Sequence, residues 1–309
     1  MLNIQFTVIA TCFNDSNNII SYFEDVCKQT VQPIKYILVD GGSKDDTINK
    51  VIEFRAKNGC QIEILCGKRL NIAQGYNEGV KATETDVIII SGIGNKYDPR
   101  FFQSLLEYYE ENHDEIVYGI TYGQSNNYFS KVYKSLYVGK DIGIHSLPTN
   151  RGLLIKREVF IEIGYFYEKL VYAGEDVEFF NLAKKNNIKI GFTEKAKLYW
   201  DTPRTFTEHQ KQKKVYFIGG LQISGLNKKM VIKSILFWAL LIIYLLTSIY
   251  FFRTVYPYVG LVAIYILVGL RIKNLSPLAL ILKIYDFLSP VVFMIYYYKY
   301  LKHEYKVKR

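Results

Sequence analysis

The sequence predicts an α/β protein: a doubly wound, mostly parallel sheet flanked by helices, followed by C-terminal transmembrane helices. Three observations lead to this prediction. Short apolar runs alternate with helical patterns over roughly the first two hundred of the 309 residues. Several of these runs end in turn residues, and long uncharged segments occur only near the C-terminus. We therefore expect one domain at residues 1–227 and a membrane anchor at 228–309.

The expected elements follow one another in a regular order. The apolar run at residues 6–12 predicts a strand, and Asn14, Asp15 and Ser16 form a turn and cap before a helix at 18–29. Residues 118–150 are rich in Tyr, Ser and Gly and are too irregular to assign. The remaining expected strands lie at 35–39, 61–66, 87–91 and 189–192, and the remaining helices at 46–57, 71–83, from Pro99 with Asp98 as cap, within 156–164, and at 176–185.

Three apolar segments follow the α/β pattern. Residues 234–252 carry no charge and match the thickness of a bilayer when helical, and residues 254–270 form a second, shorter uncharged run. The third, 275–301, is interrupted by Lys283, Asp286 and Pro290 and is either spanning or interfacial. The N-terminus lacks a signal peptide, and basic residues would hold both ends of the first two spans in the cytoplasm: Lys228, Lys229, Lys233, Arg271 and Lys273. We expect a multi-pass protein of the cell membrane with a cytoplasmic α/β domain.

Charge and cysteine content exclude other classes. The net charge of +10 comes largely from residues beside the apolar segments, where anionic membrane lipids attract it, and no nucleic-acid-binding motif is present. The four cysteines include no CxxC pair. Reduced thiols in a cytosolic domain therefore account for them better than a metal site.

Two acidic motifs carry the functional prediction. The run VDGGSKDDT (39–47) delivers Asp40 to the end of an expected buried strand, which is where open α/β sheets bind ligands. The run AGEDVEFF (173–180) places Glu175 and Asp176 at the start of an expected helix. Turn formation and helix capping explain Asp40 and Asp45 equally well, and the helix dipole alone favours acids such as Glu175 and Asp176.

At these motifs the chain resembles glycosyltransferases of family 2, which have the GT-A nucleotide-sugar-binding fold, a doubly wound mixed sheet. The resemblance covers roughly residues 6–217 and rests on TVIATCFND, VDGGSKDDT, NIAQGYNEGVKAT and NRGLLIKREVFIEIGYF followed by AGEDVEFFNLAKKNNIKIGF. It implies that Asp176 is the catalytic base of an inverting sugar transfer, kept ionised by the helix dipole, with Glu175 supporting it or holding the acceptor. It also implies a nucleotide pocket, for which we expect Thr11, Asp15, Asp40, Lys68 and Arg69.

One family feature is missing. The acids of the DxD motif, which hold Mn²⁺ or Mg²⁺ against the diphosphate, fall on Gly92 and Gly94. Three interpretations remain open: other residues hold the metal, with Asn95, Asp98 and His209 as candidates; basic side chains replace it; or the protein is a non-catalytic scaffold of a glycan-synthesis complex. The expected phosphate or acceptor contacts are Arg151, Arg204 and His209.

The resemblance implies a UDP- or GDP-sugar donor and a lipid-linked or polysaccharide acceptor at the cytosolic membrane face. Residues 202–217 lack the QxxRW pattern of processive synthases, which favours transfer of a single sugar.

Overall fold

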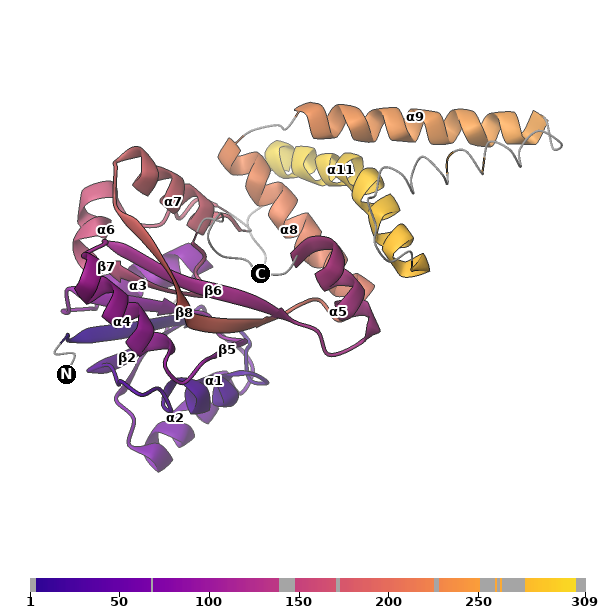
Figure 1. Cartoon of the computed structure of the whole chain (residues 1–309). Helices are drawn as coiled ribbons and strands as arrows, with labels where there is room; N and C mark the ends of the chain where they lie inside the picture. Colours follow the sequence, from indigo (N-terminus) through magenta and orange to yellow (C-terminus); the bar gives the residue numbers. More distant parts are fainter. Residues whose placement is uncertain are drawn as a thin grey trace. The chain divides into compact units, whose positions relative to one another are not determined.

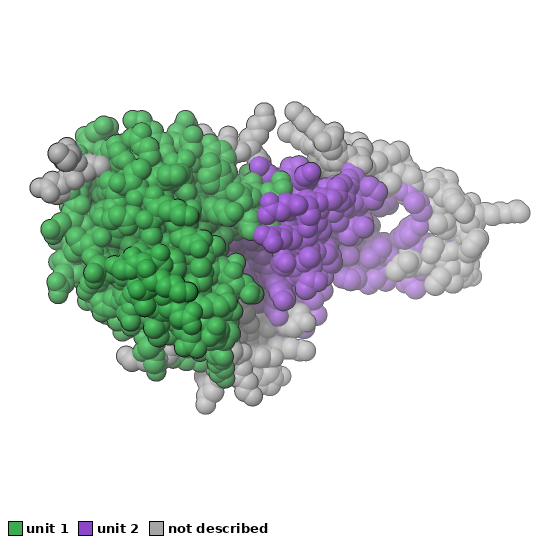
Figure 2. Space-filling view, turned by 90° about the horizontal axis from the view of Figure 1, so that it is seen from below, with its two compact units in different colours: residues 1–125, 138–202 green, residues 126–137, 203–309 purple. Residues whose placement is uncertain are grey.

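The computed structural model describes residues 4–67, 69–138, 148–170, 173–224, 228–250, 259, 262 and 276–303. The chain divides into two compact units (Figure 2). Unit 1 comprises residues 1–125 and 138–202, and unit 2 comprises residues 126–137 and 203–309. The boundary expected between residues 227 and 228 therefore falls inside unit 2.

One mixed sheet of eight strands forms the framework of unit 1 (Figure 1). Its strands are β1 (Phe6–Cys12), β2 (Lys35–Asp40), β3 (Ile62–Leu65), β4 (Val87–Ser91), β5 (Asn95–Tyr97), β6 (Ile116–Gln124), β7 (Gly152–Lys156) and β8 (Ile190–Asp201). The order across the sheet is β3-β2-β1-β4-β7-β6-β8-β5. The first four of these are parallel, β7 is antiparallel to β4 and β6, β8 is parallel to β6, and β5 is antiparallel to β8.

Each face of the sheet has its own hydrophobic core, because successive strand residues point to opposite sides. On β1, Val8 belongs to one core and Ile9 to the other. Helices α1 (Ile19–Val26), α2 (Thr47–Asn58) and α4 (Phe101–Asn112) cover the first face. Helices α3 (Ile72–Lys81), α6 (Arg157–Ile163) and α7 (Glu175–Lys185) cover the second. Since each fully buried large apolar side chain contributes about 1.5–3 kcal/mol, these two cores are the main source of stability.

Helix α3 approaches the sheet unusually closely. A Cβ atom on Gly79 would lie 2.5 Å from Cγ2 of Ile9, and one on Gly75 would lie 2.8 Å from Cγ2 of Thr11. Only glycine permits this contact without displacing β1. The close packing brings α3 against the carboxyl end of β1, where the site described below is located.

The predicted framework of unit 1 is confirmed in its main elements. The strands at 6–12 and 87–91 match β1 and β4, and most other elements differ by a few residues at their ends. The sheet is mixed, as the family resemblance implied, and the expectation of a mostly parallel sheet was too simple. Helix α4 begins at Phe101 with Arg100 as N-cap, so Asp98 is not its cap. The strand expected at 189–192 extends to Asp201 as β8.

Residues 118–150, left unassigned from sequence, contain regular structure where they are described. They hold most of β6, helix α5 (Tyr128–Tyr133) and a π-helical turn (Lys134–Val138). A Cβ on Gly119 of β6 would lie 2.1 Å from the carbonyl oxygen of Ala196 in β8. This glycine thus permits a close approach between two strands.

Unit 2 consists of helices α5, α8 (Phe206–Ser224), α9 (Lys228–Tyr250) and α11 (Pro277–His303) in its described part. Val132 of α5 packs with Ala279 and Leu282 of α11. The indole Nε1 of Trp238 in α9 donates a hydrogen bond of 3.1 Å to the carbonyl oxygen of Leu288 in α11.

Within the described residues, no single helix combines the length and the apolar character needed to cross a bilayer. Two parts of α11, Pro277–Asp286 and Leu288–Ile295, meet these criteria only together, and they meet at a bend of 42°. The expected first span largely coincides with α9, whose apolar part is the shorter segment Ile232–Tyr244. The expected second span, 254–270, lies outside the described residues apart from Val259 and Val262.

Candidate active site

The carboxyl ends of three parallel strands meet at one edge of the sheet of unit 1. Cys12 at the end of β1 is paired in register with Asp40 at the end of β2. Ser91 at the end of β4 is paired with Gly152, where the antiparallel β7 begins. The residues just before β7 therefore lie at the same edge as the Asp40 loop, as the topology of open α/β sheets requires of a ligand site.

Asp40 is almost fully buried and is held by the loop that follows it. Both of its carboxylate oxygens accept hydrogen bonds from the backbone N–H of Ser43 at 3.1 Å, and the Ser43 hydroxyl donates another at 2.6 Å. The thiol of Cys12 lies 3.6 Å from Oδ1. These contacts fix the carboxylate in one orientation before any ligand binds, which lowers the entropic cost of using it as a hydrogen-bond acceptor.

The loops after β1 and β2 are joined by side chains of both. The backbone N–H of Asp15 donates to Oγ1 of Thr47, and Asp45 accepts from the N–H of Ser16. Hydrogen bonds from Thr47 and Ser16 lower the pKa of Asp45 to about 2, whereas burial raises the pKa of Asp15 above its ordinary value. The two loops therefore form one rigid wall beside Asp40.

The two basic residues expected beside the nucleotide lie in the segment before α3. Arg69 is exposed, and the backbone N–H of the next residue, Leu70, donates to the carbonyl oxygen of Gly41. This contact places the Arg69 segment against the loop that follows Asp40. Lys68 lies outside the described residues.

Tyr76 of α3 connects the first strand to the acidic helix. Its hydroxyl contacts the side chain of Thr11 and donates to the carbonyl oxygens of Ser91 and Asn150 at 3.4 and 3.3 Å. The pKa of Tyr76 is raised by burial and by the nearby charges of Glu175 and Asp176. Tyr76 and Glu175 therefore both hydrogen-bond to Asn150, which links helix α3 to the start of α7.

Glu175 and Asp176 open helix α7 at this edge. Gly174 precedes them with φ of +106°, a conformation that favours glycine. Oε1 of Glu175 accepts a hydrogen bond of 3.4 Å from Nδ2 of Asn150, and Oδ1 of Asp176 accepts one of 2.8 Å from the N–H of Val177. Burial, followed by the charge of Asp176, raises the pKa of Glu175 to about 7.

The pKa of Asp176 is also raised, because burial outweighs the hydrogen bonds and the charge of Arg151 that lower it. That the helix dipole keeps Asp176 ionised stays a prediction. A raised pKa brings a carboxylate closer in basicity to the proton it must accept, which suits general base catalysis.

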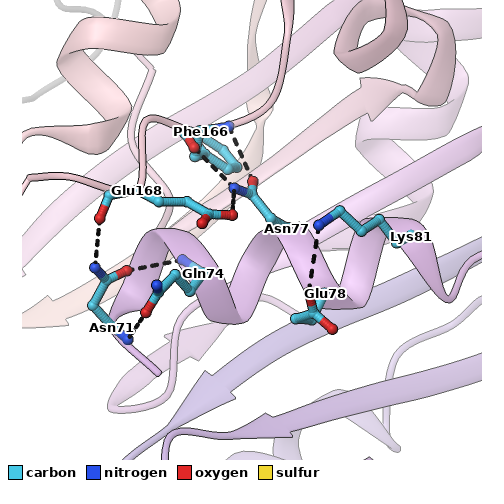
Figure 3. A network of polar contacts seen from close by, with 7 residues as sticks. All are labelled: Asn71, Gln74, Asn77, Glu78, Lys81, Phe166 and Glu168. Atoms are coloured by element: carbon cyan, nitrogen blue, oxygen red, sulfur yellow. Dashed lines mark hydrogen bonds and ion pairs between the residues drawn. The ribbon is translucent and has the colours of Figure 1, made fainter. Parts of the chain in front are cut away.

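A network on α3 holds the segment that leads to the acid pair (Figure 3). Asn77, which is buried, donates from Nδ2 to the carbonyl oxygen of Phe166 and to Oε1 of Glu168, and its Oδ1 accepts from the N–H of Phe166. The N-cap residue Asn71 donates to the carbonyl oxygen of Glu168. Because α3 also packs tightly on β1, this network ties the chain before α7 to the strand that carries Thr11.

The three expected phosphate or acceptor contacts do not all lie in unit 1. Arg151 directly precedes β7, and its guanidinium lies 4.4 Å from the centre of the Trp200 ring. Arg204 and His209 belong to unit 2. His209 is fully buried among the rings of Tyr133, Tyr137, Phe206 and Tyr285, and burial lowers its pKa to about 4.

The expected metal ligands Asn95 and Asp98 both make hydrogen bonds within unit 1. The carboxylate of Asp98 accepts a hydrogen bond from the N–H of Arg100, and the carbonyl oxygen of Asp98 accepts one from the side chain of Gln29. Gln29 follows the C-terminus of α1, so Asp98 lies at the opposite end of α1 from Thr11. Asn95 is buried and donates its amide to the carbonyl oxygen of Gly92. No group of three His, Cys, Asp or Glu side chains suitable for a metal occurs among the described residues.

Sequence reasoning missed three contributors: Tyr76, Asn77 and Asn150. Each is a buried polar residue that hydrogen-bonds to a partner 15 to 91 residues away in the sequence. Polar residues within the apolar stripe of an expected helix were the available signal for Tyr76 and Asn77. Asn150 lies next to the quoted NRGLL motif but had no distinguishing pattern of its own.

Comparison with known proteins identifies the class. The family model for Glycosyl transferase family 2 matches residues 7–170, more than half of the chain. The chain therefore belongs to this family. No curated protein matches the sequence.

Solved structures of TarS from S. aureus have a similar fold. TarS 1-349 in complex with UDP matches with a TM-score of 0.52 and 17% identity, covering 71% of this chain and 66% of that one. The complex with UDP-GlcNAc matches with a TM-score of 0.53 and 16% identity, covering 71% and 67%. This chain thus covers just under two thirds of the first of these TarS chains. At such identities the likeness establishes the GT-A-like fold alone.

Proposed function

We propose that this chain is an inverting glycosyltransferase in which Asp176 is the general base. The acceptor hydroxyl gives its proton to the carboxylate of Asp176 as its oxygen bonds to the anomeric carbon. The bond from that carbon to the diphosphate breaks on the opposite face, and the nucleoside diphosphate leaves with the electron pair. The observation that carries the proposal is that Asn150, just before β7, hydrogen-bonds to both Tyr76 and Glu175, at the sheet edge where Asp40 ends β2.

The donor is proposed to be a UDP-sugar whose nucleoside lies against Asp40. A fixed carboxylate can accept hydrogen bonds from the N–H of a base or from ribose hydroxyls. Thr11, Asp15, Lys68 and Arg69 are proposed to line the same pocket. The complexes of TarS with UDP and UDP-GlcNAc favour a uridine nucleotide over a guanosine nucleotide for a protein of this fold.

The acceptor is proposed to be a lipid-linked glycan or polysaccharide at the cytosolic face of the cell membrane. Large apolar side chains, each more than half exposed, gather on α9: Ile232, Ile235, Leu236, Leu240, Ile242, Ile243 and Leu246. Others lie on α11, including Ile281, Ile295 and Tyr298. Exposed apolar surface of this extent is typical of membrane contact, and Lys228, Lys229 and Lys233 open α9 beside it.

The membrane proposal has a direct test. We expect the full chain, expressed in cells, to stay with the membrane fraction after an alkaline carbonate wash, because hydrophobic contact resists such a wash and purely ionic attachment does not. Recovery of most of the protein in the wash supernatant would contradict the proposal. The number of spans is then tested by cysteine labelling on both sides of the membrane.

Asp176→Asn tests the catalytic proposal. Loss of a general base typically costs 10²- to 10⁴-fold in rate. We expect sugar transfer from the donor to fall by about this factor while UDP affinity changes little. Glu178→Gln, in the same turn of α7, is the matched control and should retain activity.

A scaffold without catalytic activity is the rival proposal, and it rests on Gly92 and Gly94 in place of acids. It predicts no transfer or hydrolysis of any nucleotide sugar by the wild-type protein and therefore no effect of Asp176→Asn. The burial of Glu175 and the hydrogen bonds that Glu175 and Asp176 accept from Asn150 and Val177 favour the enzyme.

A further inference from the structure

The turn after β4 is filled by its own asparagine. Gly92 has no side chain, and a Cβ atom added to it would lie 2.6 Å from Nδ2 of Asn95. That amide donates a hydrogen bond of 2.9 Å to the carbonyl oxygen of Gly92, and Asn95 is only 7% exposed. The Asn95 amide therefore occupies the space into which a side chain at position 92 would project.

Other contacts hold the turn in this shape. The N–H of Gly92 donates to the hydroxyl oxygen of Tyr97 at 2.9 Å, and that hydroxyl donates to the carbonyl oxygen of Arg151 at 2.6 Å. Gly94 has φ of +85°, a conformation that other residues rarely adopt. The turn is thus held to the residue that precedes β7, and the backbone conformation at Gly94 favours glycine.

This arrangement does not suit a divalent cation. Mg²⁺ and Mn²⁺ bind through several oxygen ligands, but positions 92 and 94 offer no side-chain oxygen. The side-chain atom closest to a Cβ at position 92 is an amide nitrogen, whose N–H groups repel a cation. Oδ1 of Asn95 has no hydrogen-bond partner among the described residues, but it is buried and is a single neutral ligand.

A fixed positive charge lies beside the same turn. Arg151 contributes its carbonyl oxygen to Tyr97, and its Cα atom lies 3.4 Å from the Cβ position of Gly92. Its guanidinium carbon lies over the Trp200 ring, 4.4 Å from the ring centre, and its charge lowers the pKa of Asp176. A guanidinium presents its N–H groups in a planar fork that matches phosphate oxygens.

We propose that Arg151, and not a divalent cation, neutralises the diphosphate of the donor. When the bond between the anomeric carbon and the diphosphate breaks, the departing oxygen takes the electron pair, and the guanidinium stabilises the added negative charge. The proton of the acceptor stays on Asp176. The Asn95 amide excludes the cation because it occupies the space into which a metal-binding side chain at position 92 would project. This inference rests on the proposed function.

Calorimetric titration of the full chain with UDP and with uridine tests the proposal, each in EDTA and in Mn²⁺. We expect wild-type affinity for UDP to be the same in both media. Arg151→Gln should weaken UDP binding by roughly 10- to 100-fold, the loss expected for hydrogen bonds to a charged group. Its affinity for uridine should not change, since uridine has no phosphate. Arg151→Lys should restore part of the affinity for UDP.

Gly92→Asp combined with Asn95→Ala is the converse variant, because removing the amide makes room for a carboxylate. We expect it to acquire stimulation of UDP binding by Mn²⁺, and a folded double variant indifferent to Mn²⁺ would show that Asn95 does not exclude the ion. Wild-type binding of UDP only with Mn²⁺, or unchanged UDP affinity in Arg151→Gln, would overturn the inference and leave the proposed function intact. Absence of UDP binding in both media would overturn both.

Discussion

Glu175→Gln should stabilise unit 1 in a strongly pH-dependent way. Glutamine keeps the size of Glu175 and an oxygen that can accept from Asn150, but it carries no charge. In the wild type, burial and Asp176 raise the pKa of Glu175 from 4.5 to about 7. Because the folded state binds this proton more tightly than the unfolded state, folding is favoured at low pH and loses stability as the pH rises from about 4.5 to 7.

The size of the effect follows from the two pKa values. Their difference corresponds to roughly 3 kcal/mol when the group is fully ionised, and about 2.5 kcal/mol of this develops between pH 5 and pH 8. For a unit of this size that equals about 5–10 °C in Tm. The variant should therefore melt close to the wild type at pH 5 and well above it at pH 8.

Fluorescence gives a suitable assay, because the chain has two tryptophans, one in each unit. In a Trp238→Phe background, Trp200 reports the unfolding of unit 1 alone. Glu162→Gln, which removes a charge at an exposed position of α6, is the control. Its Tm should differ from that of the wild type by the same amount at pH 5 and at pH 8. Equal Tm differences between Glu175→Gln and wild type at pH 5 and pH 8 would show that the pKa of Glu175 is not raised on folding.

Three further predictions concern the fold and the nucleotide site. Asp40→Asn should weaken UDP binding by roughly 10- to 100-fold in calorimetry, since hydrogen bonds to a charged acceptor contribute about 1.5–3 kcal/mol; unchanged affinity would remove Asp40 from the pocket. Gly79→Ala should destabilise unit 1 by about 1–3 kcal/mol in denaturant titration through contact with Ile9, and Gly220→Ala, where an added Cβ has no neighbour within 4 Å, should not. Asp286→Asn should destabilise unit 2, monitored in detergent by Trp238, because Lys213, Lys283 and the Tyr137 hydroxyl all contact this carboxylate; an unchanged melting curve would contradict that role.

Local patterns were sufficient for the framework of the fold. The runs that became β1 and β4 are continuous apolar segments bounded by turn residues, so their ends could be located from sequence. The mixed order of the sheet and the strand β6 could not, because they depend on pairings between distant segments. Gly119 illustrates the difficulty: it lies in a segment left unassigned from sequence, whereas in the structure it allows the carbonyl of Ala196 to approach.

Site residues that belong to a sequence motif could be predicted, whereas residues that join the site only through tertiary contacts could not. Asp40 could be predicted because it ends an expected strand, and Glu175 and Asp176 because they begin an expected helix. Their connection through Tyr76 and Asn150 could not, because both residues act through partners brought together by folding. The sign of the pKa shift at Asp176 also depends on burial, which no local pattern reveals.

A crystal structure of the full chain grown with UDP in the presence of EDTA tests the central claim most directly. We expect the uridine to donate hydrogen bonds to the carboxylate of Asp40 and the diphosphate to lie within ion-pair distance of Arg151, beside Asp176. A nucleotide bound away from Asp40, or with its diphosphate directed away from the acid pair, would exclude this site for the donor.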